Sequence, residues 1–189
     1  MKRALAASIT LLVLGTACGG DGASSGPSGT PSNESTAGFK THTDAGNGFT
    51  IKYPPDWAEQ KSPEGAAVAF LAPTEDTADR FRENINVLIQ SLPDSDMSLQ
   101  EYTDLSTRQG PQLIEGFKVL DQDEISVGGH AANRVHYTGG ISGNDFEWEA
   151  VWLVEGGKAY VITFTASPDR FSDYIERARA ALNSFQLTG

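Results

Sequence analysis

The sequence predicts an α+β fold in which an antiparallel β-sheet of about six to seven strands is sandwiched between helices. The main observation is a set of segments whose apolar residues alternate or run together as in strands: 48–53, 66–72, 84–92, 117–127, 130–139, 145–155 and 159–166. Two other segments, 99 to about 109 and 168–184, repeat apolar residues at helical spacing. Gly-Gly pairs between the later strands are typical of tight hairpins, so we expect an antiparallel meander.

The strand patterns also predict how the sheet is covered. In segment 48–53, Phe49, Ile51 and Tyr53 alternate with polar residues, as in a half-buried strand that the two following prolines end. Segment 145–155 instead carries apolar residues on both faces. We therefore expect 145–155 to be a central strand, with a helix on each side of the sheet.

The two helices have recognisable start signals. Ser98 and Glu101 form a capping-box pattern at the start of the first helix. The Gly-Pro pair at 110–111 either ends that helix or bends it, and the sequence leaves both possibilities open. The Ser-Pro-Asp triplet at 167–169 supplies an N-cap, a proline at the first helical position and an early acid. The second helix is therefore expected to begin at 168.

The first 17 residues have the pattern of a secretory signal peptide. Lys2 and Arg3 precede an apolar run, 4–14, which is shorter than the roughly 20 residues needed to span a bilayer. Small residues then lead directly into Cys18, the single cysteine of the chain. This arrangement resembles the lipobox of bacterial lipoproteins.

The lipobox resemblance implies a location at the membrane. It implies cleavage before Cys18, a diacylglycerol thioether on the sulfur, and an amino group acylated with a fatty acid such as palmitate. Two or more acyl chains give stable anchoring. The mature protein would then be held on the extracytoplasmic face of the cell membrane and would have no disulfide. An ordinary cleaved signal followed by an incidental cysteine is the alternative.

The mature chain is expected to be a tethered, acidic domain. Residues 18–46 comprise Cys18 and a flexible linker rich in Gly, Ser, Pro and Thr, and residues 47–189 form the folded domain. Loss of Lys2 and Arg3 with the signal peptide changes the formal net charge from −11 to −13. Such a charge argues against a nucleic-acid partner, and also against electrostatic binding to anionic lipid.

The three histidines and two acidic runs are the candidate metal ligands in the sequence. His130 and His136 share a strand face but lie about 20 Å apart along an extended chain, so they cannot bind one ion together. These two and His42 are interpreted as solvated polar residues, and no metal or other cofactor is expected. The acidic runs 93–98 and 121–124 are interpreted as solvated loops, with weak calcium binding as the alternative.

No catalytic motif is present, so no catalytic residue is assigned and an enzyme is not expected. The sequence lacks a Gly-x-Ser-x-Gly elbow, a His-Glu-x-x-His pair and a phosphate-binding loop. Trp57 follows the double proline, and Tyr53 ends the strand before it. These two aromatic residues are the candidate partner-binding residues if their side chains are exposed, and core residues otherwise.

Several stretches together resemble the PsbP-like family, which includes DcrB-like envelope lipoproteins. They are "GFTIKYPPDW", "EISVGGHAANRVHYTG", "WLVEGGKAYVITFTASPDRF" and the closing "LNSFQL". The resemblance implies an antiparallel sheet between helices. The type member is an extrinsic subunit of photosystem II that helps to retain calcium and chloride. The basic segment through which the plant protein docks has no counterpart here, because 19–46 contains one lysine, Lys40.

These observations predict a lipid-anchored, extracytoplasmic accessory protein that is not catalytic and binds a protein partner in the cell envelope. The alternative is a protein that binds a small hydrophobic or ionic ligand, weak calcium binding included. A photosystem II-type subunit is a further alternative if the host is photosynthetic. A deep apolar pocket of about 300 Å³ or more would favour the small ligand. A flat exposed patch would favour the protein partner.

Overall fold

The computed structural model describes residues 35–61, 63, 65–74 and 81–188. Ten strands and two helices lie in this part of the chain. The strands are β1 (Lys40–Asp44), β2 (Phe49–Tyr53), β3 (Ala58–Lys61), β4 (Val68–Leu71), β5 (Asn84–Ser91), β6 (Glu115–Val127), β7 (His130–Ile141), β8 (Asn144–Glu155), β9 (Lys158–Ala166) and β10 (Gln186–Leu187), and the helices are α1 (Leu99–Leu113) and α2 (Phe171–Asn183).

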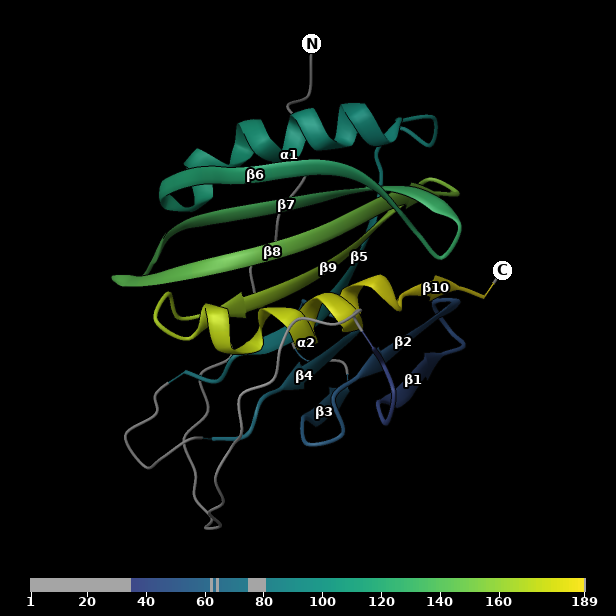
Figure 1. Cartoon of the computed structure of the whole chain (residues 1–189). Helices are drawn as coiled ribbons and strands as arrows, with labels where there is room; N and C mark the ends of the chain where they lie inside the picture. Colours follow the sequence, from purple (N-terminus) through teal and green to yellow (C-terminus); the bar gives the residue numbers. More distant parts are fainter. Residues whose placement is uncertain (1–34, 62, 64, 75–80, 189) are drawn as a thin grey trace.

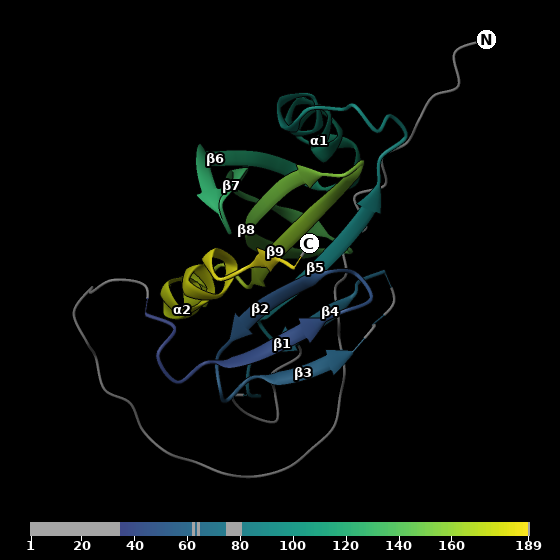
Figure 2. The same ribbon diagram turned by 90° about the vertical axis from the view of Figure 1, so that its right-hand side faces the viewer.

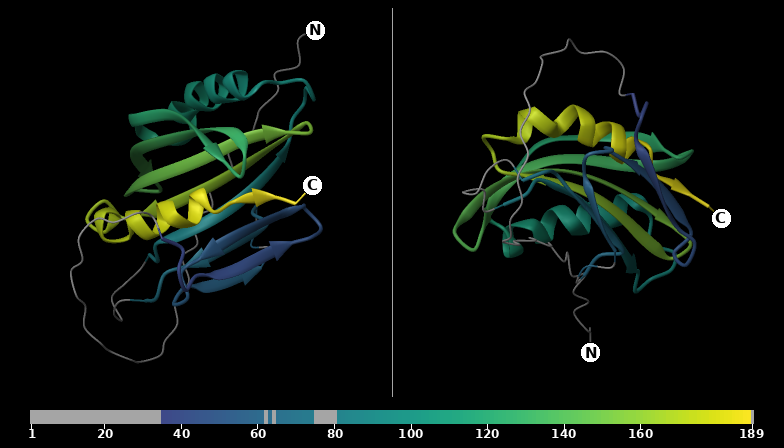
Figure 3. Two further views of the ribbon diagram at one scale, coloured as in Figure 1. Left: turned by 45° about the vertical axis from the view of Figure 1, so that its right-hand side comes forward. Right: turned by 90° about the horizontal axis from the view of Figure 1, so that it is seen from below.

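The expected α+β sandwich is confirmed. A seven-stranded antiparallel sheet, in the order β3-β4-β5-β9-β8-β7-β6, lies between α1 on one face and α2 on the other (Figures 1 and 3). A small three-stranded sheet, in the order β1-β2-β10, packs on the α2 side (Figure 2). The segment predicted to be a central strand is β8, which lies between β9 and β7 in the interior of the sheet, and its residues contribute to the cores on both faces.

The large sheet does not contain the same seven segments as expected. The predicted strand 48–53 is β2 in the small sheet, and its place is taken by β3, which the alternation pattern did not show. The reason lies in the turn that follows β2, where the Trp57 amide donates to the Pro54 carbonyl and redirects the chain. The sheet is also not a simple meander, because β9 pairs with β5 on the side away from β8.

The folded domain begins earlier than residue 47. Residues 40–44 were expected in the linker but form β1, which pairs with β2 from Lys40 opposite Tyr53 to Asp44 opposite Phe49. This strand is mostly polar, so the pairing, and not an apolar pattern, determines its conformation. The His42 ring packs at 5.8 Å from the Phe49 ring and closes this corner of the core.

The end of α1 and the start of α2 differ from those expected. The capping box of Ser98 and Glu101 is present, and α1 continues through Pro111 to Leu113 instead of ending near 109. Helix α2 begins at Phe171, one turn later than expected. The Ser167 hydroxyl donates to Glu83, and the residues after it form a turn, so Ser167 does not cap the helix.

The Gly-Gly hairpins are confirmed. Gly128 and Gly129 have φ of 59° and 85°, and Gly156 and Gly157 have φ of 58° and 73°. Positive φ at both central residues defines the type I′ turn, which matches the twist of the flanking strands and favours glycine. These turns set the β6–β7 and β8–β9 registers without a connecting loop.

Candidate binding surface at helix α1 and strand β6

A small cavity lies between α1 and the sheet. On β8, Trp148 and Trp152 project toward α1, and Ala150 lies between them. Thr163 is opposite Ala150 on β9, so this pair of smaller side chains lies between the two pairs that contain the tryptophans. On the helix side, Ser106 and Gly110 are small as well. The result is a mostly apolar cavity of about 50 Å³.

Two hydrogen bonds join polar side chains of α1 to the sheet near the cavity. The Tyr102 hydroxyl donates to Gln90 Oε1 at 2.8 Å, and the Trp152 indole donates to Thr103 Oγ1 at 2.8 Å. These bonds also connect α1 to β5 and to β8. Because these polar groups are already satisfied, they stabilise the helix on the sheet and do not prepare the cavity for a polar ligand.

Two buried tyrosines make the stability sensitive to alkaline pH. Burial raises the pKa of Tyr102 to about 12 and raises the pKa of Tyr137 further. In the unfolded chain a tyrosine has a pKa near 10. The unfolded state therefore loses these protons first, so the stabilisation is complete below pH 10 and is lost as the pH rises through the folded-state pKa.

We expect the free energy of unfolding to fall by about 1 kcal/mol per pH unit for each of Tyr102 and Tyr137 between pH 10 and 12. Urea titrations at a series of alkaline pH values measure this slope. The Tyr102→Phe variant serves as the control, because lysines also titrate in this range. In this variant the free energy of unfolding should fall less steeply with pH, because Tyr102 no longer contributes. An unchanged slope would contradict a raised pKa for Tyr102.

Exposed apolar side chains gather where α1 meets β6. In the described part of the chain, the large apolar side chains that are exposed are Leu113 (51%), Leu120 (45%) and Val119 (36%). Leu113 ends α1, and the other two are the fifth and sixth residues of β6. Leu113 and Phe117 also line the cavity. We call Leu113, Phe117, Val119 and Leu120 the α1–β6 surface.

A close approach to β7 determines how α1 and β6 join. A Cβ atom on Gly139 of β7 would lie 2.3 Å from Ile114 Cγ2 and 2.9 Å from the Glu115 carbonyl oxygen. Ile114 and Glu115 connect the helix to the strand. Gly139 therefore lets this connection lie directly on the sheet and positions the α1–β6 surface.

Gly139→Ala is expected to lower the free energy of unfolding by about 2 kcal/mol, because a backbone carbonyl cannot move aside cheaply. Gly140→Ala is the matched control. Its Cβ would approach no atom closer than 3.4 Å, so we expect a change within about 0.5 kcal/mol. Denaturant unfolding of both variants measures the difference, and equal effects would show that the close contact is unimportant.

The sequence did not single out this surface. Segment 117–127 was expected to alternate, but Val119 and Leu120 are consecutive apolar residues and break that period. The structure shows an irregularity at the same place, a register shift between Val119 and Asp121. The sequence feature that could have predicted this surface is the pair of consecutive apolar residues, Val119 and Leu120, directly before the acidic run 121–124.

Trp57 and Tyr53 do not form an exposed patch. Trp57 is 2% exposed and Tyr53 is 6% exposed, and both belong to the core on the α2 side. The Tyr53 ring stacks on Phe70 at 4.3 Å, and its hydroxyl donates to Glu59. Trp57 and Tyr53 were candidates for partner binding only if their side chains were exposed. Both are buried, so we assign them to the core.

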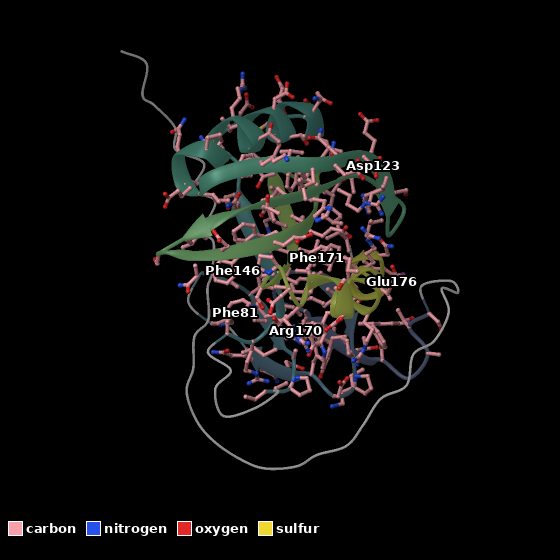
Figure 4. The ribbon with its side chains drawn as sticks, turned by 60° about the vertical axis from the view of Figure 1, so that its left-hand side comes forward. Phe81, Asp123, Phe146, Arg170, Phe171 and Glu176 are labelled. Carbon is pink, nitrogen blue, oxygen red and sulfur yellow. The ribbon has the colours of Figure 1, made fainter. Side chains whose placement is uncertain are left out.

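The histidines are less solvated than expected, and each lies beside a carboxylate. The His42 side chain is 10% exposed, and its Nδ1 lies 3.1 Å from Glu59. His136 Nε2 lies 2.7 Å from Glu147, and its ring stacks on Phe171 at 4.8 Å. Figure 4 labels Phe171 at the start of α2. His130 lies 3.3 Å from Glu155 at the β8–β9 turn.

The described residues contain no group of three or more potential metal ligands. Asp94 in the run 93–98 accepts a hydrogen bond from the Asp96 amide, which is a turn interaction. The run 121–124 is not a loop, because it lies within β6. Cys18 lies outside the described residues, so its modification stays a prediction. Among the described helices, none is long and apolar enough to cross a bilayer.

Fold and surface together define a small α+β sandwich whose candidate site is an apolar surface beside a sheet edge. A family model described as PsbP matches residues 37–187. The chain therefore belongs to the PsbP family. The matched segment includes β1, in agreement with the earlier domain start in the structure. No curated protein sequence matches the chain.

Solved structures with a similar fold come from several organisms. Cyanobacterial PsbP (CyanoP) from Synechocystis sp. PCC 6803 is 19% identical with a TM-score of 0.59, covering 86% of this chain and 99% of that one. LpqN of Mycobacterium tuberculosis, involved in cell envelope biogenesis, is 15% identical with a TM-score of 0.56, covering 80% and 92%. The Ran-binding protein Mog1p of Saccharomyces cerevisiae is 12% identical with a TM-score of 0.52, covering 79% and 95%. At these identities the likeness concerns the fold alone.

Proposed function

We propose that this protein is a non-catalytic accessory protein, anchored by lipid on Cys18 to the extracytoplasmic face of the cell membrane, which binds a protein partner in the envelope. The observation that carries the binding role is the α1–β6 surface. In the described part of the chain, the exposed large apolar side chains all lie within residues 113–120, from the end of α1 to the first half of β6. Contiguous exposed apolar residues mark interaction sites on soluble domains.

The shape of the site favours a protein over a small molecule. The cavity under α1 measures about 50 Å³, whereas pockets for small ligands measure roughly 300–1,000 Å³. A space of this size can accept the tip of one apolar side chain beside Leu113 and Phe117. A few anchoring side chains of this kind supply much of the affinity in protein interfaces.

Two fold relatives are consistent with this proposal by analogy. LpqN is involved in cell envelope biogenesis, and Mog1p binds the protein Ran. Neither relative assigns a partner to this chain, because one fold supports many functions. The identity to CyanoP is too low to assign a photosystem role. The basic docking segment of the plant protein also has no counterpart here, because 19–46 contains one lysine, Lys40.

The anchor is tested with Cys18→Ser. We expect the wild-type protein in the membrane fraction and the variant in the detergent-free supernatant. Mass spectrometry of the wild-type N-terminal peptide should show a chain that begins at Cys18 and carries acyl groups. Membrane retention of the variant, or an unmodified thiol in the wild type, would disprove the anchor.

The binding role is tested by site-specific photo-crosslinking in cells. A photoreactive amino acid replaces Leu120 on the α1–β6 surface or, as the control, Glu176, whose side chain is 70% exposed on α2 (Figure 4). We expect one reproducible crosslinked protein from position 120 and none from position 176. The same adducts from both positions, or none from position 120, would refute a partner at this surface.

A further inference from the structure

Strand β6 presents a long unpaired edge. It spans 13 residues, forms the end of the seven-stranded sheet and pairs with β7 on one side only in the described part of the chain (Figures 1 and 2). The strand at the other end of the sheet, β3, has four residues. At the free side of an antiparallel edge, alternate residues turn their backbone N–H and C=O groups outward, where another strand can bond to them.

The edge has an irregular half and a regular half. Both register shifts of the β6–β7 pair lie between Glu115 and Asp121, next to the exposed Val119 and Leu120. From Asp121 to Val127 every residue pairs in sequence with β7. Bulges protect edge strands against unwanted pairing. The shifts here leave a regular stretch of seven residues that no bulge interrupts.

The charge of the regular half restricts what can pair with it. Asp123 forms an ion pair with Arg134 at 2.7 Å, but Asp121 and Glu124 have no ion pair among the described residues. Because they are three positions apart in a strand, their side chains project to opposite faces of the sheet. An added strand would therefore meet a free carboxylate on each face.

A second copy of this chain is a poor occupant. Two antiparallel β6 strands that pair through 121–124 would place carboxylates opposite carboxylates, which is destabilising. The formal net charge of −11 for the chain adds repulsion between copies. A segment with basic residues would instead gain from each of these charges.

We propose that the regular half of β6 binds an extended, basic segment of the partner protein as an added antiparallel strand. Lysine or arginine residues three positions apart lie opposite Asp121 and Glu124, and apolar residues that follow them cover Leu120 and Val119. Backbone hydrogen bonds supply affinity and the charges supply specificity, as in other cases of strand addition. This inference rests on the proposed function and specifies how the partner is held.

The experiment uses the whole purified protein and a labelled synthetic peptide of about ten residues, a usual strand length. The peptide has two lysines three positions apart, followed by two valines, in a threonine background. Fluorescence anisotropy measures its dissociation constant at low and high salt. One control peptide carries glutamates in place of the lysines. A second keeps the lysines but is N-methylated at alternate backbone positions, which removes hydrogen-bond donors.

We expect saturable binding of the lysine peptide that weakens with salt, and dissociation constants about tenfold or more higher for both control peptides. The double variant Asp121→Lys, Glu124→Lys should reverse the preference, so that the glutamate peptide binds and the lysine peptide does not. Both positions are exposed, so the variant should fold normally, and circular dichroism and thermal unfolding check this.

Three outcomes would overturn strand addition. These are equal binding of the N-methylated peptide, an unchanged preference in the double variant, and no saturable binding at concentrations up to about 1 mM. The photo-crosslink at position 120 separates this failure from failure of the proposed function. If a partner is still captured there, the partner binds by another mode, and if none is captured, the binding role itself fails.

Discussion

Trp57→Ala is expected to lower the free energy of unfolding by about 3–5 kcal/mol, the loss that follows deletion of a buried indole from a core. The Trp57 ring lies 6.4 Å from Phe164 on β9 and 6.0 Å from Tyr174 on α2, between ring centroids. Its side chain is 2% exposed. Alanine would leave a cavity between the sheet and α2 that these neighbours cannot fill.

Trp57→Phe separates packing from hydrogen bonding at this position. The indole N–H of Trp57 has no hydrogen-bond partner in the part of the chain that the structure describes. Phenylalanine removes this buried donor and keeps a ring, so we expect a smaller loss, about 1–2 kcal/mol. Denaturant unfolding measures both variants. A stable Trp57→Ala variant that no longer binds its partner would show instead that Trp57 is an anchor.

Arg179→Ala is expected to lower the free energy of unfolding by about 3 kcal/mol, because it leaves a buried carboxylate without its partner. Glu149 on β8 is 1% exposed, and Arg179 on α2 approaches its two oxygens with bonds of 2.7–3.0 Å. This pair joins the second helix to the centre of the sheet. Arg179 is itself partly exposed, so the lower end of the range for buried pairs applies.

The matched control is Arg177→Ala in the same helix. Arg177 pairs with Asp56 at the surface, where both side chains are more than 40% exposed. An exposed ion pair contributes about 0–1 kcal/mol, so this variant should be close to wild type. Equal losses in the two variants would mean that the effect reflects helix α2 in general and not the buried Glu149 carboxylate.

Most strands and the Gly-Gly turns could be predicted from the sequence, because the local apolar pattern and the tertiary packing agree in these segments. Phe49 and Ile51 alternate in the sequence and are fully buried in β2. Segment 145–155 carries apolar residues on both faces and forms β8, an interior strand that contributes to both cores. The Gly-Gly pairs adopt the positive φ that their turns require.

The remaining parts depend on contacts that a local pattern does not contain. Strand β1 is polar, and its partner β2 determines its conformation. Ser167 matched an N-cap but bonds to Glu83, 84 residues away in the sequence. The exposure of Val119 and Leu120 follows from the position of β6 at the sheet edge, because the same apolar residues in an interior strand would be buried.

Thiol labelling in intact cells tests most directly whether a partner covers the α1–β6 surface outside the cytoplasm. Leu120→Cys and Glu176→Cys are compared with a reagent that does not cross the cytoplasmic membrane, since the chain has one cysteine of its own, Cys18. We predict equal rates in the purified proteins. In cells we predict fast labelling of Glu176→Cys and labelling of Leu120→Cys slowed about tenfold or more. Equal rates in cells would contradict the covered surface, and no labelling of either variant would contradict the extracytoplasmic location.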